Sequence, residues 1–65
     1  MLIFELSLRD AKKGMELIKD VPELRREINE IDTNVFTVNK YSDGESIEDI
    51  FQLYGIEYEL QDTEN

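Results

Sequence analysis

The chain has 65 residues with 16 acidic and 7 basic side chains, which gives a formal net charge of −9, and it contains neither cysteine nor histidine. This composition excludes a disulfide framework, a thiolate nucleophile, an imidazole base and the common zinc sites. A chain of this length forms one small domain, predicted here over residues 1–60, and its stability depends on a well-formed core or on homo-oligomerisation.

The N-terminal segment has the alternation of a half-buried strand. Apolar residues occupy the even positions from Leu2 to Leu8, with mostly polar residues between them. Ser7 followed by Asp10 resembles a capping box, so a helix is expected to begin near residue 9.

An apolar stripe with steps of three and four residues runs through residues 11–31 and predicts helix. Pro22 interrupts this stripe, and inside a helix a proline costs about 3 kcal/mol. Asp20 suits an N-cap and Pro22 suits a first turn. Two consecutive helices, about 9–19 and 21–31, are therefore favoured, although the continuous stripe leaves one kinked helix as an alternative.

A second strand and a last helix follow. Residues 35–41 are rich in β-branched and aromatic side chains, which is typical of a strand. Ser46 with Asp49 opens a helix in capping-box style, and its apolar side chains recur at i, i+3, i+4 and i+7. Gly55 follows the last of them, and glycine at that place ends a helix.

The C-terminal part predicts a third strand and a tail. Residues 56–60 alternate between apolar side chains and two glutamates, Glu57 and Glu59, which is the pattern of a strand with one face in water. Residues 61–65 are polar and are expected to form a frayed tail.

The predicted order of elements is β-α(α)-β-α-β. Strands separated by helices usually pair in parallel. Since all three strands alternate, only one face of their sheet is apolar, and helices are expected to cover that face alone. The sequence thus predicts an α+β or small α/β fold, a two-layer sandwich with a three-stranded sheet. Tyr41, Glu57 and Glu59 are expected on the uncovered face.

The loop near Asn39 partly matches a calcium-binding loop. Asn39, Asp43 and Gly44 fit the first, fifth and sixth positions. The third position is Tyr41, which offers no carboxylate, and the twelfth is Ile50, where a bidentate glutamate is required. An ordinary turn explains the same residues, so no metal site is predicted.

Catalytic machinery is not recognisable in this sequence. Glu57 and Glu59 share a wet strand face, whereas acid–base catalysis needs two carboxyl groups in different environments. A glycine-rich phosphate loop is also missing. The sequence therefore predicts no catalytic residue, no cofactor and no enzyme, and a small enzyme or metal binder is the third-ranked hypothesis.

Six of the seven basic residues lie between Arg9 and Arg26. Two short helices in this region resemble a helix-turn-helix, so a nucleic-acid-binding accessory protein is the alternative function. The second predicted helix, however, alternates arginines with glutamates, and a recognition helix concentrates positive charge.

The sequence lacks the hallmarks of membrane targeting. No run reaches the 18 apolar residues of a membrane span, and the N-terminus has no basic segment like that of a signal peptide. We expect a cytoplasmic protein without a membrane partner.

The charge is concentrated at the C-terminal end. Residues 1–40 hold seven basic and eight acidic residues, whereas residues 41–65 hold eight acidic residues and no basic one. Such a field repels nucleic acid and attracts a basic protein surface, although acidity also serves solubility alone.

The leading hypothesis is a small acidic protein-binding module that regulates or inhibits a partner with a basic surface. Nucleic-acid mimicry, in which carboxylates take the place of phosphates in a basic groove, is its sharper form. The candidate partner-binding residues are Tyr41, Glu48, Asp49, Glu57 and Glu59.

Overall fold

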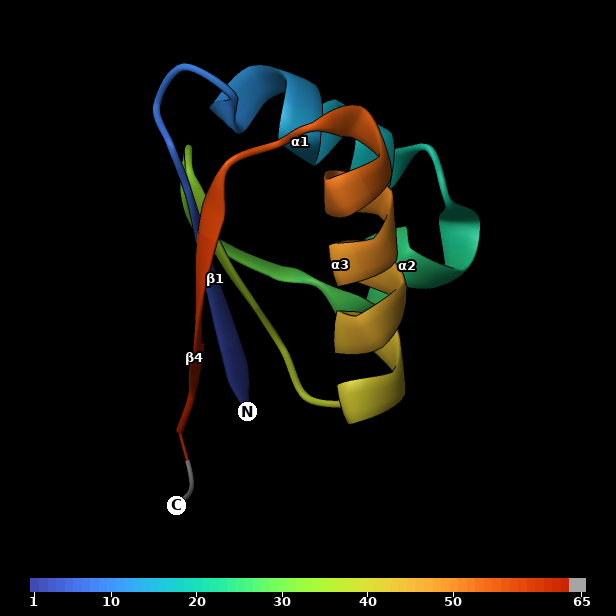
Figure 1. The fold of residues 1–65 in the computed structure, drawn as a ribbon. Helices are drawn as coiled ribbons and strands as arrows, with labels where there is room; N and C mark the ends of the chain where they lie inside the picture. Colours follow the sequence, from blue (N-terminus) through green and yellow to red (C-terminus); the bar gives the residue numbers. More distant parts are fainter. Residues whose placement is uncertain (64–65) are drawn as a thin grey trace.

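The structure is a computed structural model that describes residues 1–63. Its elements are β1 (Leu2–Leu6), α1 (Ala11–Lys19), α2 (Pro22–Glu27), β2 (Asn29–Asp32), β3 (Val35–Val38), α3 (Tyr41–Tyr54) and β4 (Tyr58–Asp62). The strands form one sheet in the order β2-β3-β1-β4, and all neighbouring strands are antiparallel. The helices lie together on one side of this sheet (Figure 1). The predicted α+β class and two-layer arrangement are confirmed.

The predicted three-stranded, parallel sheet is wrong, because the last part of the second predicted helix, 21–31, forms a strand. α2 ends at Glu27, and Ile28 already has extended backbone, with φ −87° and ψ 145°. Residues 29–32 then form β2, which turns through Thr33 and Asn34 to pair with β3. This hairpin reverses the chain once more than the sequence predicted, so β3 runs antiparallel to β1.

Strands joined by a helix run in the same direction, but contrary to the expectation they do not pair with each other. Each helical connection, from β1 to β2 and from β3 to β4, joins two strands of the same direction. One other strand lies between the members of each such pair. This is the doubled split β-α-β topology of ferredoxin-like domains.

Aromatic rings form the centre of the core between the sheet and the helices. Phe4 and Phe36 are stacked with centroids 5.0 Å apart, and Phe51 packs edge-on against them at 6.1 and 6.3 Å. All three rings are fully buried, as is Leu6. Phe51 of α3 and Leu6 of β1 therefore both belong to the helix–sheet interface.

The start of α3 differs from the prediction, because Gly44 is not part of a turn. α3 begins at Tyr41, five residues before the predicted cap at Ser46, and the predicted strand 35–41 ends at Val38. A Cβ atom added to Gly44 would overlap Leu2 Cδ1. The glycine therefore allows the helix to approach β1 closely.

The other helix boundaries are close to those predicted. Pro22 is the first residue of α2, as expected, although the cap is Val21 and Asp20 instead ends α1. α3 ends at Gly55, whose φ of 69° is the left-handed conformation that glycine adopts without strain. Two separate helices at Pro22 are thus confirmed over one kinked helix.

The edge strand β4 extends into the predicted tail. Gln61 and Asp62 belong to β4, and the N–H of Thr63 donates to the carbonyl of Met1 at 2.9 Å. Pairing with the whole length of β1 accounts for this extra order. Residues 64 and 65 of the predicted tail lie outside the described residues.

Gly14→Ala is expected to destabilise the protein, although alanine is the better helix former by about 1 kcal/mol. A Cβ atom at Gly14 would overlap Leu6 Cδ2 and lie 3.2 Å from Ile56 Cγ2. Leu6 is fully buried among core side chains, so overpacking should cost about 1–3 kcal/mol. Urea unfolding would measure the loss, with Glu16→Ala on the exposed side of α1 as the control. A more stable Gly14→Ala protein would contradict this close packing.

Candidate functional site

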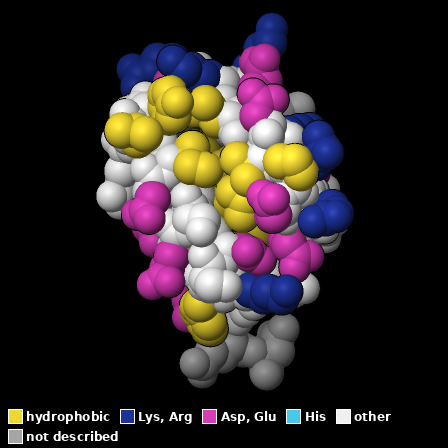
Figure 2. All heavy atoms as spheres, turned by 90° about the vertical axis from the view of Figure 1, so that its right-hand side faces the viewer, with side chains coloured by type: hydrophobic (Ala, Val, Ile, Leu, Met, Phe, Trp, Pro, Cys, Tyr) yellow, Lys and Arg dark blue, Asp and Glu magenta, His cyan; other side chains and the backbone are white. Residues whose placement is uncertain are grey.

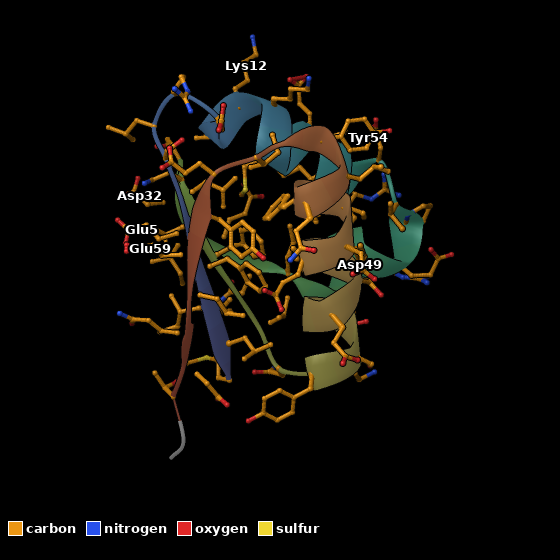
Figure 3. The ribbon with its side chains drawn as sticks, viewed as in Figure 1. Glu5, Lys12, Asp32, Asp49, Tyr54 and Glu59 are labelled. Carbon is orange, nitrogen blue, oxygen red and sulfur yellow. The ribbon has the colours of Figure 1, made fainter. Side chains whose placement is uncertain are left out.

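The uncovered face of the sheet carries a row of acidic side chains. Glu5 lies opposite Val35 on one side and opposite Glu59 on the other, and Asp32 lies opposite Val35. Directly opposed residues share a sheet face. Figure 3 shows Glu5, Asp32 and Glu59 on the side of the sheet away from the helices.

Glu57 extends this row toward the start of β4. It precedes Glu59 by two residues and therefore points to the same side. Two bonds hold its backbone: its carbonyl accepts from Ser7 N–H at 3.0 Å, and its N–H donates to Asp10 Oδ2 at 2.9 Å. The second bond is the main reason why the pKa of Asp10 is lowered. We call Glu5, Asp32, Glu57 and Glu59 the acidic sheet face.

Few positive charges oppose the acidic sheet face. Among the described residues, Arg9 is the cation that contacts it, with Nη2 at 3.5 Å from Glu57 Oε1. Both side chains are mostly exposed, so this ion pair stabilises little. Glu5 and Glu59 lie directly opposite each other, and like charges at such positions destabilise a sheet. The surface thus retains unfavourable charge that a basic partner would relieve.

An open hollow adjoins these carboxylates. It has a volume of about 260 Å³ and lies where β1 ends and β4 begins. Its lining residues are Glu5, Leu6, Ser7, Glu57, Tyr58 and Glu59. A cationic side chain of a partner would meet carboxylates on both strands here.

The remaining residues on the uncovered side of the sheet are less exposed to solvent than the alternating pattern predicted. Thr37 is 7% exposed, and Ile3 and Val35 are half-buried. These residues belong to β1 and β3, the two central strands of the sheet. On this side of the sheet, the centre is therefore shielded from water, whereas Glu5, Asp32, Glu57 and Glu59 are exposed.

The structure separates the five candidate residues predicted from the sequence. Glu57 and Glu59 lie together on the acidic sheet face. Asp49 lies on α3 on the opposite side of the molecule, away from the sheet (Figure 3). Glu48 is half-buried, and its Oε1 accepts a hydrogen bond from the Tyr58 hydroxyl at 2.7 Å.

Tyr41 is not on the sheet, contrary to the prediction. It is the first residue of α3, and its hydroxyl donates to the carboxylate of Asp62 at 2.9 Å. This contact ties the start of α3 to the end of β4, and it raises the pKa of Tyr41. Tyr41 is therefore separate from the acidic sheet face.

Two members of the acidic sheet face were not candidates from the sequence. The alternation in β1 placed Glu5 on the wet face, but no local signal shows that β1 and β4 are neighbours. Asp32 was expected in a break after a helix, and only the β2–β3 hairpin brings it onto the sheet.

The basic residues do not form one continuous stripe. Lys19 Nζ lies 2.9 Å from Glu30 Oε1, and Lys40 Nζ lies 3.0 Å from Glu27 Oε1. The contact with Glu27 raises the pKa of Lys40. On the helical face, basic side chains lie near the rim, and acidic side chains and an apolar cluster lie between them (Figure 2).

The apolar cluster on the helical face comes from the end of α3 and the α1–α2 junction. Leu53 and Tyr54 are 78% and 51% exposed, and the partly buried Leu17, Val21 and Ile50 pack against the core. Tyr54 is labelled at the upper end of α3 (Figure 3). This cluster lies across the molecule from the acidic sheet face.

Tyr58→Phe is expected to reduce the amount of stability that the protein loses as the pH rises into the alkaline range. Burial, followed by the hydrogen bond to Glu48, raises the pKa of Tyr58 above its ordinary value of 10.0. A raised pKa favours the neutral phenol in the folded state. Its stabilisation is complete below pH 10.0 and is lost as the pH rises through the higher folded pKa.

Urea unfolding of the wild type and of Tyr58→Phe at about pH 8 and about pH 11 would measure this effect. At the lower pH the variant should lose about 1 kcal/mol with its hydrogen bond. The difference between the two proteins should shrink at the higher pH. An equal difference at both values would contradict a role for this phenol.

Two further classes of site were tested in residues 1–63. No group of three or more acidic side chains there is arranged to hold a metal ion. None of the helices in this range is both long and apolar enough to cross a membrane.

Comparison of the chain with protein-family models, with curated proteins and with solved structures found no match.

Proposed function

We propose that this protein is a small acidic binding module that regulates or inhibits a partner protein with a basic surface. The acidic sheet face is the proposed contact surface. The observation that supports this proposal is the gathering of Glu5, Asp32, Glu57 and Glu59 on the sheet face that the helices leave uncovered.

The arrangement of these charges favours binding over solubility alone. Solubility is served by charges of both signs spread over a surface. Here like charges oppose each other at Glu5 and Glu59, which costs stability in the free protein. A basic surface would pair with them and would be steered toward them during encounter.

The same array supports a sharper form of the proposal, nucleic-acid mimicry. Glu57 and Glu59 are about 6.7 Å apart along the strand, and neighbouring strands are about 4.8 Å apart. A rigid sheet thus presents carboxylates at regular intervals, as a backbone presents phosphates. Under this form, the partner's own nucleic acid and this protein compete for one groove.

Direct nucleic-acid binding through residues 9–26 has less support. Arg9 and Lys19 are engaged with carboxylates, and α2 has six residues, too few for a recognition helix of ordinary length. The net charge of −9 opposes phosphate binding as well.

Affinity capture with matched charge reversals would test the proposal. The wild type, Glu57→Lys/Glu59→Lys and Glu45→Lys/Asp49→Lys would each be immobilised and exposed to a cytosolic extract of the source cells. Both variants change the net charge equally, but the second alters the exposed side of α3.

We expect a basic protein to be retained by the wild type and by the α3 variant and to be lost from the sheet variant. Release of that protein by added nucleic acid would support mimicry. Equal capture by all three proteins, or loss only from the α3 variant, would contradict the acidic sheet face as the contact surface.

A further inference from the structure

The outer edge of β4 has backbone groups without a partner strand. β4 is the last strand of the sheet and pairs with β1 alone. Met1 and Thr63 exchange both of their backbone hydrogen bonds, at 3.1 and 2.9 Å. In an antiparallel ladder such pairs recur at every second residue. Glu59 and Gln61 therefore point their N–H and C=O groups toward β1, and the C=O of Glu57 continues this pattern by accepting from Ser7 N–H.

The alternate residues of β4 point the other way. Tyr58, Leu60 and Asp62 direct their N–H and C=O groups to the open edge, while their side chains lie on the helical side of the sheet. In Figure 1 no other element of the described chain lies beyond β4 on that side. The edge is a template for one more strand.

β4 lacks three of the features that protect an edge strand, namely proline, lysine and a bulge. Its charged side chains, Glu59 and Asp62, are both acidic, so they repel an acidic strand but not a basic one. The other edge strand, β2, has a register irregularity between Glu30 and Asp32. β4 has a regular register from Tyr58 to Asp62 and contains neither proline nor lysine. The regular edge is thus the one beside the acidic sheet face.

Charge selects the kind of strand that fits. Glu57, Glu59 and Asp62 lie in or next to β4, and no basic residue follows Lys40 in the chain. A second copy of β4 would therefore bring carboxylates against carboxylates. On the helical side, Tyr58 and Leu60 are half-buried and would be covered further by apolar neighbours.

We propose that the β4 edge binds an extended segment of the basic partner as an additional strand. Basic side chains of that segment lie beside Glu57 and Glu59, and the alternate, apolar side chains lie beside Tyr58 and Leu60. Main-chain hydrogen bonds supply affinity and the alternation supplies specificity. This inference rests on the proposed function, because it takes a basic partner as its starting point.

The first test uses a short peptide in which lysine and valine alternate. A peptide of the same composition, with the lysines in one block and the valines in another, is its control. NMR titration should show the alternating peptide shifting the amides of Tyr58, Leu60 and Asp62 and slowing their hydrogen exchange. Equal binding of the block peptide, or shifts spread over all acidic regions, would indicate unspecific attraction and would overturn the proposal.

The second test blocks the edge without changing a side chain. Chemical synthesis of this short chain allows N-methylation of Leu60, which removes an outward N–H and leaves the bonds to β1 in place. The matched control is N-methylation of Glu30. β3 bonds to β1 through Asn34 and every second residue after it, which includes Phe36. Glu30 lies opposite Phe36. Because the backbone groups of Phe36 point toward β1, the N–H of Glu30 has no partner on β3 and points to the outer edge of β2.

Methylation of Leu60 should lower the affinity for the alternating peptide about tenfold or more, because it removes one main-chain hydrogen bond and hinders close approach of the peptide. Methylation of Glu30 should leave this affinity unchanged. Thermal unfolding would show that both proteins remain folded. Unchanged affinity after methylation of Leu60 would overturn the edge mode. If affinity capture of the partner nevertheless requires Glu57 and Glu59, the proposed function stands and only the binding of a strand at the β4 edge is rejected. Concentration-dependent shifts at β4 without peptide would instead indicate self-association and would contradict the proposal.

Discussion

Phe51→Ala is expected to unfold this domain or to leave it barely stable. Phe51 is fully buried and is the residue through which α3 contacts the aromatic centre of the sheet. Its ring centroid lies 5.3 Å from that of Tyr58 and 6.1 Å from that of Phe4. Removing such a ring costs about 3–5 kcal/mol. A 65-residue domain has in total only about 3–10 kcal/mol.

Circular dichroism and urea unfolding would measure this loss. Leu53→Ala is a suitable control, because Leu53 lies two residues further along α3 and is 78% exposed. It should change the unfolding free energy by less than about 0.5 kcal/mol. A Phe51→Ala protein with a near-native midpoint would show that α3 is not held by its aromatic contact.

The elements that the sequence predicted correctly are those with a local signal. The apolar spacing in α3, the stop at Gly55 and the alternation in β4 each depend on neighbouring residues. The β2–β3 hairpin was missed because its local signals are ambiguous. Ile28 and Ile31 continue the helical spacing of the preceding stripe, and they suit a short strand equally well.

The turn of that hairpin also lacks the usual signal. Two-residue hairpin turns of the favoured types need positive φ, which Asn-Gly pairs supply. Thr33 and Asn34 make this turn, and no residue other than glycine has positive φ in residues 1–63. The irregular register between Glu30 and Asp32 accommodates this less usual turn, and a sequence pattern does not reveal such a compensation.

The candidate site could be predicted only in part, because local patterns place single strands but do not show which strands are neighbours. Alternation alone placed Glu57 and Glu59 on a wet face. Their neighbour Glu5 is 54 residues away from Glu59 along the chain, so only the sheet order shows that they meet. The sequence misplaces Tyr41 because Asp43-Gly44 has the composition of a turn, whereas Gly44 serves helix–strand packing.

Glu59→Lys is expected to stabilise the free protein and at the same time to slow its association with the proposed basic partner. In the wild type, Glu59 lies directly opposite Glu5, and both side chains are exposed. The substitution turns a like-charge pair into an opposite-charge pair, which should add about 0.2–1 kcal/mol. It also removes negative charge from the proposed contact surface, which should lower the association rate about tenfold or more at low salt.

Urea unfolding and stopped-flow binding at two salt concentrations would measure both effects. The rate difference should shrink at high salt, because exposed charges are screened there. Asp49→Lys changes the net charge equally on the far side of the molecule, so it should slow association less. A wild-type rate for Glu59→Lys at low salt would contradict binding through the acidic sheet face. Slow association of a variant that is more stable than the wild type could not result from partial unfolding, because unfolding would lower stability and rate together.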